Sequence, residues 1–260
     1  MTPEDLAAVG LRLDIDGPVA TVTLDRPDVR NAQTPAMWIA LGEIGRTLPD
    51  DVRVVVVTGE GETFSAGLDR AMLDPSHADE GSVLGLLALS DEDASARIEE
   101  FQRGFTWLRD PRFVSLAKVR GYAIGAGFQL ALSCDLRVVA DDAKFSMKES
   151  ALGLVPDLTG TKPLVEHVGY ARALEICATG RFVTAEESVN IGLANLAVPG
   201  AELDGAVQDL AAALLAAPRD AVIETKALLR GAQGRTYDEQ RGAERAAQAR
   251  RLRDLAGLGE

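Results

Sequence analysis

The stretch from residue 114 to residue 140 restricts the possible folds more than any other part of the chain. It begins with an apolar run at 114–119, the pattern of a buried strand. A turn with glycines at 121, 125 and 127 follows, then a short apolar helix that ends near Leu132, and then a second strand at 136–140. This order predicts an α/β fold.

The flanking sequence continues the same layering. Alternating apolar residues on both sides of Asp16-Gly17 predict an opening hairpin, and a helical pattern at 34–48 leads into a β-branched strand at 52–57. The acidic segment 72–93 is expected to be a mobile surface segment, and a helix follows that ends at Asp110-Pro111. After a short strand at 144–147, helices are expected from Pro163 onward, including 203–217, 221–229 and the charged stretch 238–254. Thr184 and Glu187 have the spacing of a helix capping box.

Composition narrows the classes of function. With 27 basic and 40 acidic residues the net charge is −13, which disfavours nucleic acid as a partner. The two cysteines, Cys134 and Cys177, have neither a disulfide framework nor metal-site spacing, and two histidines leave acid–base work mainly to carboxylates. The start of the chain lacks signal-peptide features, and no apolar run reaches the ~18 residues of a membrane span. We therefore expect one large domain in the cytoplasm.

Two glycine-containing turns are the first candidates for a ligand-binding site. These are the turns at 64–69 and 125–127, each directly before an expected helix or loop. Small residues let backbone N–H groups approach a ligand oxygen, and two such amides form an oxyanion hole. The alternative is that both are tight turns chosen only for backbone conformation. A dinucleotide site is excluded by spacing, because the glycines at 121, 125 and 127 do not form G-x-G-x-x-G.

Four landmarks in fixed order together resemble the enoyl-CoA hydratase/isomerase (crotonase) family. The central landmark is the line from Lys118 to Arg137 with its turn Gly125-Ala126-Gly127, and the others are Asp25-Arg26-Pro27 with Asn31-Ala32, Phe64-Ser65-Ala66-Gly67-Leu68-Asp69, and Leu152 to Asp157 with Gly160-Thr161. The similarity extends from about residue 11 to residue 198 and more loosely to the end.

The resemblance implies a crotonase-like spiral of ββα repeats. It places the core domain at 1–198 and a C-terminal helical oligomerisation region at 199–260, in a homotrimer or a homohexamer. The implied substrate is an acyl-CoA thioester of fatty acid metabolism, with coenzyme A as part of the substrate, no separate cofactor and no metal. The amides of Leu68 and Ala126 are expected to bind the thioester oxygen. The further candidate substrate-binding residues are Ser65, Ala66, Asp69, Gly125, Gln129, Arg30 and Lys226; the last two are candidates for the phosphates, with ordinary solvated side chains as the alternative.

The acid–base residues depart from the family pattern. Family hydratases have a glutamate at the position of Gln129 and another at that of Glu149, whereas a neutral amide cannot exchange a proton at a useful pKa. Gln129 is expected either to orient water or substrate or to be a polar residue satisfied near a helix start. Glu149 and Asp157 match carboxylate positions of dienoyl-CoA isomerases of the family. We therefore expect a double-bond isomerase that uses Glu149 and Asp157, with two alternatives: a hydratase that uses Glu149 alone, and a non-catalytic acyl-CoA-binding protein.

Overall fold

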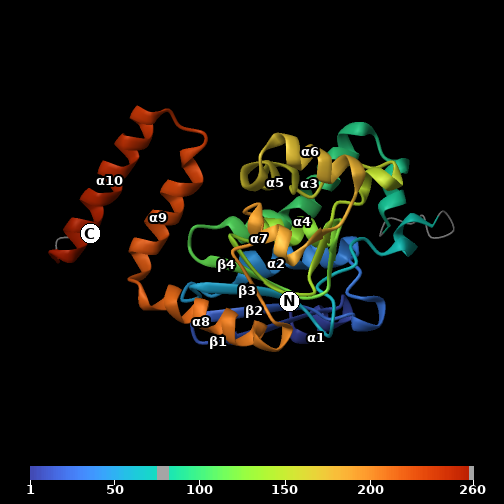
Figure 1. The fold of residues 1–260 in the computed structure, drawn as a ribbon, viewed down its shortest axis with the longest axis horizontal. Coiled ribbons are helices and arrows are strands. Elements are labelled where there is room, and N and C mark those ends of the chain that lie inside the picture. The colour runs from blue at the N-terminus through green and yellow to red at the C-terminus, as the bar shows by residue number, and fades with distance from the viewer. Residues whose placement is uncertain (75–81, 258–260) are drawn as a thin grey trace.

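The computed structural model describes residues 1–74 and 82–257, and Figure 1 gives the fold as a ribbon. The strands are β1 (Leu11–Asp16), β2 (Val19–Leu24), β3 (Val54–Gly59), β4 (Val114–Val119), β5 (Tyr122–Ile124), β6 (Leu136–Ala140), β7 (Lys144–Ser146), β8 (Val183–Thr184) and β9 (Leu196–Val198). The α-helices are α1 (Pro3–Ala8), α2 (Pro35–Thr47), α3 (Asp91–Thr106), α4 (Ala126–Ser133), α5 (Thr161–Val168), α6 (Tyr170–Thr179), α7 (Ala185–Asn190), α8 (Leu203–Ala216), α9 (Arg219–Ala232) and α10 (Tyr237–Leu255). Short 3-10 turns are η1 (Pro27–Val29), η2 (Arg70–Leu73), η4 (Val83–Ala88), η5 (Trp107–Arg109), η6 (Glu149–Leu152) and η7 (Gly200–Glu202).

The larger sheet has the strand order β1-β2-β3-β4-β6-β9. The predicted hairpin is present, because β1 and β2 pair antiparallel, and every other pairing in this sheet is parallel. The β-branched strand β3 lies inside the sheet, where Val54 pairs with Val19 on one side and with Val114 on the other. A parallel strand with neighbours on both sides and both faces covered explains this run of valines.

A smaller sheet, β5-β7-β8, positions the site. The chain passes from β4 in the larger sheet to β5 in the smaller one, through α4, and back to β6 and then β7. Ser65, which follows β3, forms an isolated parallel bridge with Ala123 of β5. The segment after β3 therefore pairs with the smaller sheet. The turn that follows β3 and the turn that follows β5 therefore lie side by side.

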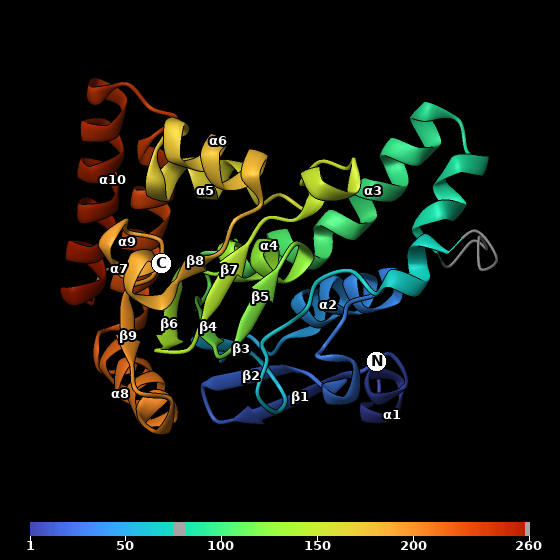
Figure 2. The same cartoon turned by 45° about the vertical axis from the view of Figure 1, so that its right-hand side comes forward.

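Alternate residues of β3 contact different helices. Val54 and Val56 belong to a core cluster with Leu203, Val207 and Ala211 of α8. Val55 and Val57 belong to the main core cluster, which includes side chains of α2, α3 and α4. This alternation is the period of two expected of a strand. Helix α8 thus covers one face of the larger sheet, and helices α2, α3 and α4 lie on the other face (Figure 2).

Helices α9 and α10 extend away from this core as a pair, at the left of Figure 1. The division of the chain at 198/199 into core and oligomerisation region stays a prediction, although α8 itself packs on the sheet through Leu203, Val207 and Ala211. In the residues that the structure describes, no helix is both long and apolar enough to cross a membrane.

Three local features differ from the sequence-based expectations. Helix α1 was not expected; it is capped by Thr2 and Asp5, which form a capping box. Only one of the two hydrogen bonds of the capping box expected at Thr184 forms. The Thr184 hydroxyl accepts from the Glu187 amide, but the Glu187 carboxylate pairs with Arg181. The segment 72–93, expected to be a mobile surface segment, contains η4 and the start of α3, and residues 75–81 lie outside the described residues.

Candidate active site

The two glycine turns lie against each other. The Ser65 amide donates to the Tyr122 carbonyl (2.8 Å), and the Ile124 amide donates to the Ser65 carbonyl (3.0 Å). Gly67 has φ 89°, and a Cβ built on it would lie 2.5 Å from the Ile124 oxygen. A side chain at position 67 would therefore push the turns apart, and only glycine permits both the positive φ and this close approach.

The amides of Leu68 and Ala126 lie where the two turns meet. On either side of Leu68, the Gly67 carbonyl accepts from the Gln33 amide (2.7 Å) and the Asp69 amide donates to the Gln33 carbonyl (2.8 Å). Ala126 is the first residue of α4, where backbone amides have no partner inside the helix. Its nitrogen lies 3.6 Å from the Cβ position of Gly67, so the two turns meet close to it. That both amides reach one oxygen stays a prediction.

A large cavity opens beside these turns. Its volume is 1260 Å³, and its wall includes Leu68, Ala126, Gln129, Glu149 and Asp157. Apolar side chains line much of the remaining wall; they include Trp38, Val83, Leu86, Ile98, Phe101, Leu152, Leu158 and Phe182. A large apolar cavity with a few convergent polar groups is typical of a small-molecule site.

Glu149 supplies a buried carboxylate at the second turn. The residue is 9% exposed and begins η6. Its Oε1 accepts from the Gln129 amide at 2.7 Å, whereas its Oε2 is buried without a hydrogen-bond partner among the described residues. A Cβ built on Gly125 would lie 3.3 Å from Oε1 and 3.7 Å from Oε2, so the carboxylate faces the turn that carries Ala126. An unpartnered buried oxygen on a cavity wall marks a position for a ligand group.

Burial raises the pKa values of both candidate carboxylates. For Glu149, burial is the largest cause of the raised pKa, the charge of Asp157 adds to it, and hydrogen bonds, including that from Gln129, oppose it. The pKa of Asp157 is raised by burial alone. Two carboxylates with raised pKa values, in a mostly apolar wall, suit proton transfer to and from a bound substrate.

Gln129 bonds to protein groups with both ends of its amide. The residue is 1% exposed. Its Nε2 donates to Glu149, and its Oε1 accepts from the amides of Leu158 (2.9 Å) and Gly160 (3.2 Å). Of the two expectations for this residue, these contacts favour a satisfied polar group over one that holds water by its carbonyl oxygen.

The first turn uses most of its polar groups internally. Ser65 is fully buried, its hydroxyl donates to the Asn31 carbonyl (2.8 Å), and it is absent from the cavity wall. The Ala66 amide donates to the Arg30 carbonyl, while Ala66 itself lines the cavity. Asp69 also lines it, and its carboxylate binds Arg26 at 3.0 Å. The expected ligand contact at Ser65 is therefore not supported, because its amide, carbonyl and hydroxyl already have partners.

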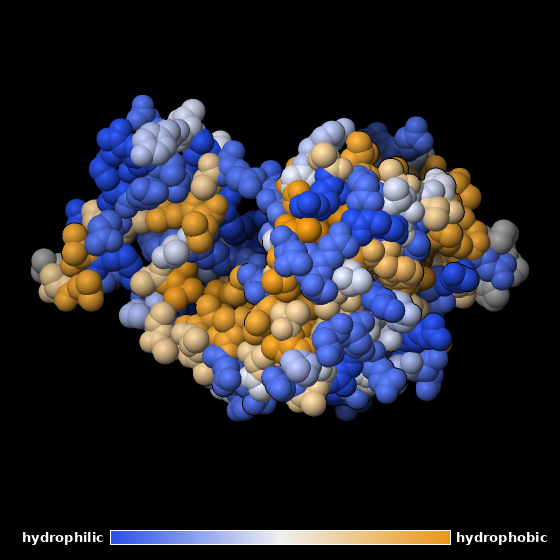
Figure 3. All heavy atoms as spheres, viewed as in Figure 1, coloured by the Kyte–Doolittle hydropathy of each residue, from blue (hydrophilic) through white to orange (hydrophobic). Residues whose placement is uncertain are grey.

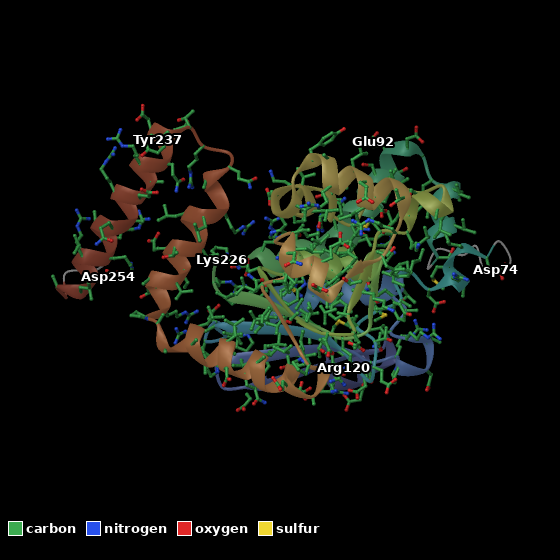
Figure 4. The ribbon with its side chains drawn as sticks, viewed as in Figure 1. Asp74, Glu92, Arg120, Lys226, Tyr237 and Asp254 are labelled. Atoms are coloured by element: carbon green, nitrogen blue, oxygen red, sulfur yellow. The ribbon has the colours of Figure 1, made fainter. Side chains whose placement is uncertain are left out.

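The two expected phosphate-binding residues lie in different places. Arg30 is exposed and lines the cavity. Lys226 does not line it: its Nζ donates to the carbonyls of Asp110 and Phe113 and pairs with Asp135 at 2.7 Å. Figure 4 shows Lys226 on α9. Lys226 is 8% exposed, so it is neither a cavity residue of this chain nor a solvated side chain, and its three acceptors make it an anchor for α9.

Sequence reasoning missed Arg70. This exposed residue lines the cavity directly after the first turn, and its place next to Asp69 was the available signal.

Comparisons with known proteins identify the family. The chain belongs to the enoyl-CoA hydratase/isomerase family, whose model matches residues 14–254. A carnitinyl-CoA dehydratase of Salmonella arizonae is 36% identical over 232 residues, which cover 88% of this chain and 83% of that protein. A short-chain-enoyl-CoA hydratase of Clostridium acetobutylicum is 31% identical over 227 residues, covering 85% and 81%. The crystal structure of a putative enoyl-CoA hydratase from Thermobifida fusca in complex with acetoacetyl-CoA has a TM-score of 0.93 and 52% identity, and covers 97% of this chain and 98% of that one. The predicted family and the predicted α/β crotonase fold with C-terminal helices are confirmed.

Proposed function

We propose that the protein shifts double bonds in enoyl- or dienoyl-CoA thioesters through an enolate held by the amides of Leu68 and Ala126. One observation carries this proposal: Glu149 is a buried carboxylate with a raised pKa whose Oε2 has no partner among the described residues and lies beside the Ala126 turn. A neutral Gln129 stands where the hydration chemistry of the family uses a second glutamate, and its carbonyl oxygen already has two donors. Proton transfer without water activation fits this set of groups better than water addition.

The proposed reaction needs one base and one oxyanion site. Glu149 removes a proton from C2 of a 3-enoyl thioester, and the electron pair of the C–H bond forms the enolate, whose oxygen accepts from the two amides. The protonated carboxyl group then returns the proton at C4, the double bond moves to C2–C3, and the carboxylate is regenerated. Asp157 is the alternative group for the return step, after which a proton has to pass from Glu149 to Asp157.

The substrate is proposed to be an acyl-CoA thioester. The Thermobifida fusca protein was crystallised in complex with acetoacetyl-CoA, and its fold covers nearly all of this chain. Arg30 and Arg70 are exposed cations on the cavity wall and are the candidates here for the phosphates of coenzyme A. The apolar part of the wall suits an acyl chain. No further cofactor enters the proposed reaction.

Water addition or elimination by Glu149 alone is the second candidate function. The names of the relatives favour it, since one is a dehydratase and another a hydratase. In that case the unpartnered Oε2 of Glu149 activates the water, with no second carboxylate at position 129 to share it.

One assay separates these functions. The protein is incubated in ¹⁸O-water with 3-enoyl-, 3,5-dienoyl- and 2-enoyl-CoA, and the products are followed by mass and by absorbance of the conjugated thioester. Isomerisation predicts products of unchanged mass with a moved double bond. Incorporation of ¹⁸O into the 2-enoyl substrate without bond migration would replace the isomerase proposal by the hydratase. Binding without any turnover, identical in Glu149→Gln, would indicate an acyl-CoA-binding protein.

We also propose that the α9–α10 pair binds another copy of the chain, as in a trimer or a hexamer. Leu229 is 70% exposed on α9, and Leu255 is 84% exposed on α10. Figure 3 shows apolar surface between this pair and the core. Light scattering of the full chain tests the proposal; a monomer at micromolar concentration would contradict it.

A further inference from the structure

The side chain of Gln129 joins the two segments that carry the candidate carboxylates. Its Nε2 donates to Glu149 Oε1 at 2.7 Å, on η6. Its Oε1 accepts from the amides of Leu158 and Gly160, in the loop 153–160 that carries Asp157. One buried amide group therefore fixes one oxygen of Glu149 and the backbone that follows Asp157.

The loop that Gln129 holds has an unfavourable backbone. Thr159 has φ 68°, a left-handed conformation that β-branched residues rarely adopt. The two amides that flank Thr159, those of Leu158 and Gly160, donate to the same Gln129 oxygen. A Cβ built on Gly160 would lie 2.6 Å from Gln129 Cγ, so glycine at 160 makes room for this side chain. The loop and Gln129 fit each other, and the hydrogen bonds offset the cost of the Thr159 conformation.

An amide satisfies both sides of this arrangement without having to hold a proton. The loop needs an acceptor, and the Glu149 carboxylate needs a donor. A glutamate at position 129 could accept from both loop amides, but in its ionised form it would face Glu149 as a second carboxylate. The two carboxyl groups would then share one proton, because two carboxylate charges in close contact repel each other.

We infer that Gln129 is a positioning residue that holds Glu149 as an ionised base with Oε2 turned to the cavity and fixes the Asp157 loop beside it. The inference rests on the proposed function, which assigns proton transfer to Glu149. It also predicts that a glutamate at position 129 disturbs the base and does not create the second carboxylate of a hydratase.

Two substitutions separate the donor role from the acceptor role. Gln129→Glu keeps an acceptor for the loop and, in its ionised form, loses the donor to Glu149. Gln129→Met has similar size and loses both. Gln208→Glu and Gln208→Met, at an exposed position of α8, are the matched controls.

The first readout needs no catalytic activity. The titration of Glu149 is followed by ¹³C NMR of the glutamate carboxyl carbons, with the signal assigned by its loss in Glu149→Gln. The pKa of Glu149 is expected to rise by about one unit or more in Gln129→Glu, because a like charge replaces a donor, and to rise in Gln129→Met, because the donor is lost. Hydrogen exchange at Leu158 and Gly160 is expected to stay slow in Gln129→Glu and to accelerate in Gln129→Met. An unchanged Glu149 titration in both Gln129 variants, or exchange that is equally slow in Gln129→Met, would overturn the inference.

The second readout is the pH profile of kcat/KM for isomerisation. Its acid limb is expected to move to higher pH in Gln129→Glu, with the affinity for acetoacetyl-CoA within about threefold of wild type. A tenfold or larger gain of water addition in Gln129→Glu would overturn the positioning role, since residue 129 would then be a water-holding residue. Should wild-type protein isomerise no substrate, the proposed function fails, whereas the NMR and exchange measurements still decide the role of Gln129.

Discussion

Replacing Gly67 by alanine tests the link between the fold and the oxyanion turns. The new Cβ would lie 2.5 Å from the Ile124 oxygen. Ordinary C···O contacts begin at about 3.3 Å, so the turns that carry Leu68 and Ala126 must separate by roughly 0.8 Å. A misplacement of about 1 Å costs about 10²-fold in rate, and complete loss of one oxyanion donor costs about 10²–10³-fold in kcat. We therefore expect kcat to fall by about two orders of magnitude.

Gly17→Ala is the matched control. Gly17 also has positive φ (51°), in the turn between β1 and β2, but no atom lies within 4 Å of a Cβ built there. Both variants have a backbone cost of about 1–2 kcal/mol for an L-residue in this region. The control should therefore lose a few degrees in Tm and keep its activity, whereas Gly67→Ala should lose both. The assays are circular dichroism melting and initial rates with a 3-enoyl-CoA. A folded Gly67→Ala protein with kcat within threefold of wild type would refute the proposed role of the paired turns.

Three further predictions concern titratable groups. Glu149→Gln is expected to lower kcat by about 10²–10⁴-fold while acetoacetyl-CoA still binds, as measured by initial rates and calorimetry; unchanged kcat would remove Glu149 from the mechanism. Asp157→Asn removes a charge that raises the pKa of Glu149, so the acid limb of the pH–rate profile should move to lower pH, and a move to higher pH would contradict this cause. Burial, together with the charge of the nearby Arg137, lowers the pKa of His167 to about 4. Since the unfolded chain then binds more protons than the folded one, stability should be lost as pH falls from about 6.5 toward 4, and urea unfolding of His167→Gln should lose part of that slope.

Local patterns were sufficient for much of the fold. The strand at 114–119 has the expected bounds, and α8 and α10 lie within one residue of the expected limits, because burial on both faces and helical spacing leave a direct trace in sequence. The glycine turns were also recognisable, since the backbone conformations at Gly67 and Gly125 restrict the residue type. The positions of Glu149 and Asp157 came from family resemblance.

Side-chain partners could not be predicted in the same way. Gln129, Glu149 and Leu158 are far apart in sequence, and spacing alone does not say which end of an amide contacts which segment. Lys226 was expected at a phosphate because the family resemblance implies basic residues there, with an ordinary solvated side chain as the alternative. Its burial depends on how α9 packs on the loop at 110–113 and on Asp135, which is a property of the assembled fold.

The most direct test of the proposed site is a crystal structure of this protein with acetoacetyl-CoA. The account predicts that the thioester oxygen lies about 2.7–3.1 Å from the nitrogens of both Leu68 and Ala126, with Glu149 Oε2 next to the C2 carbon. A thioester oxygen that contacts neither nitrogen, or a Glu149 carboxylate turned away from C2, would contradict it.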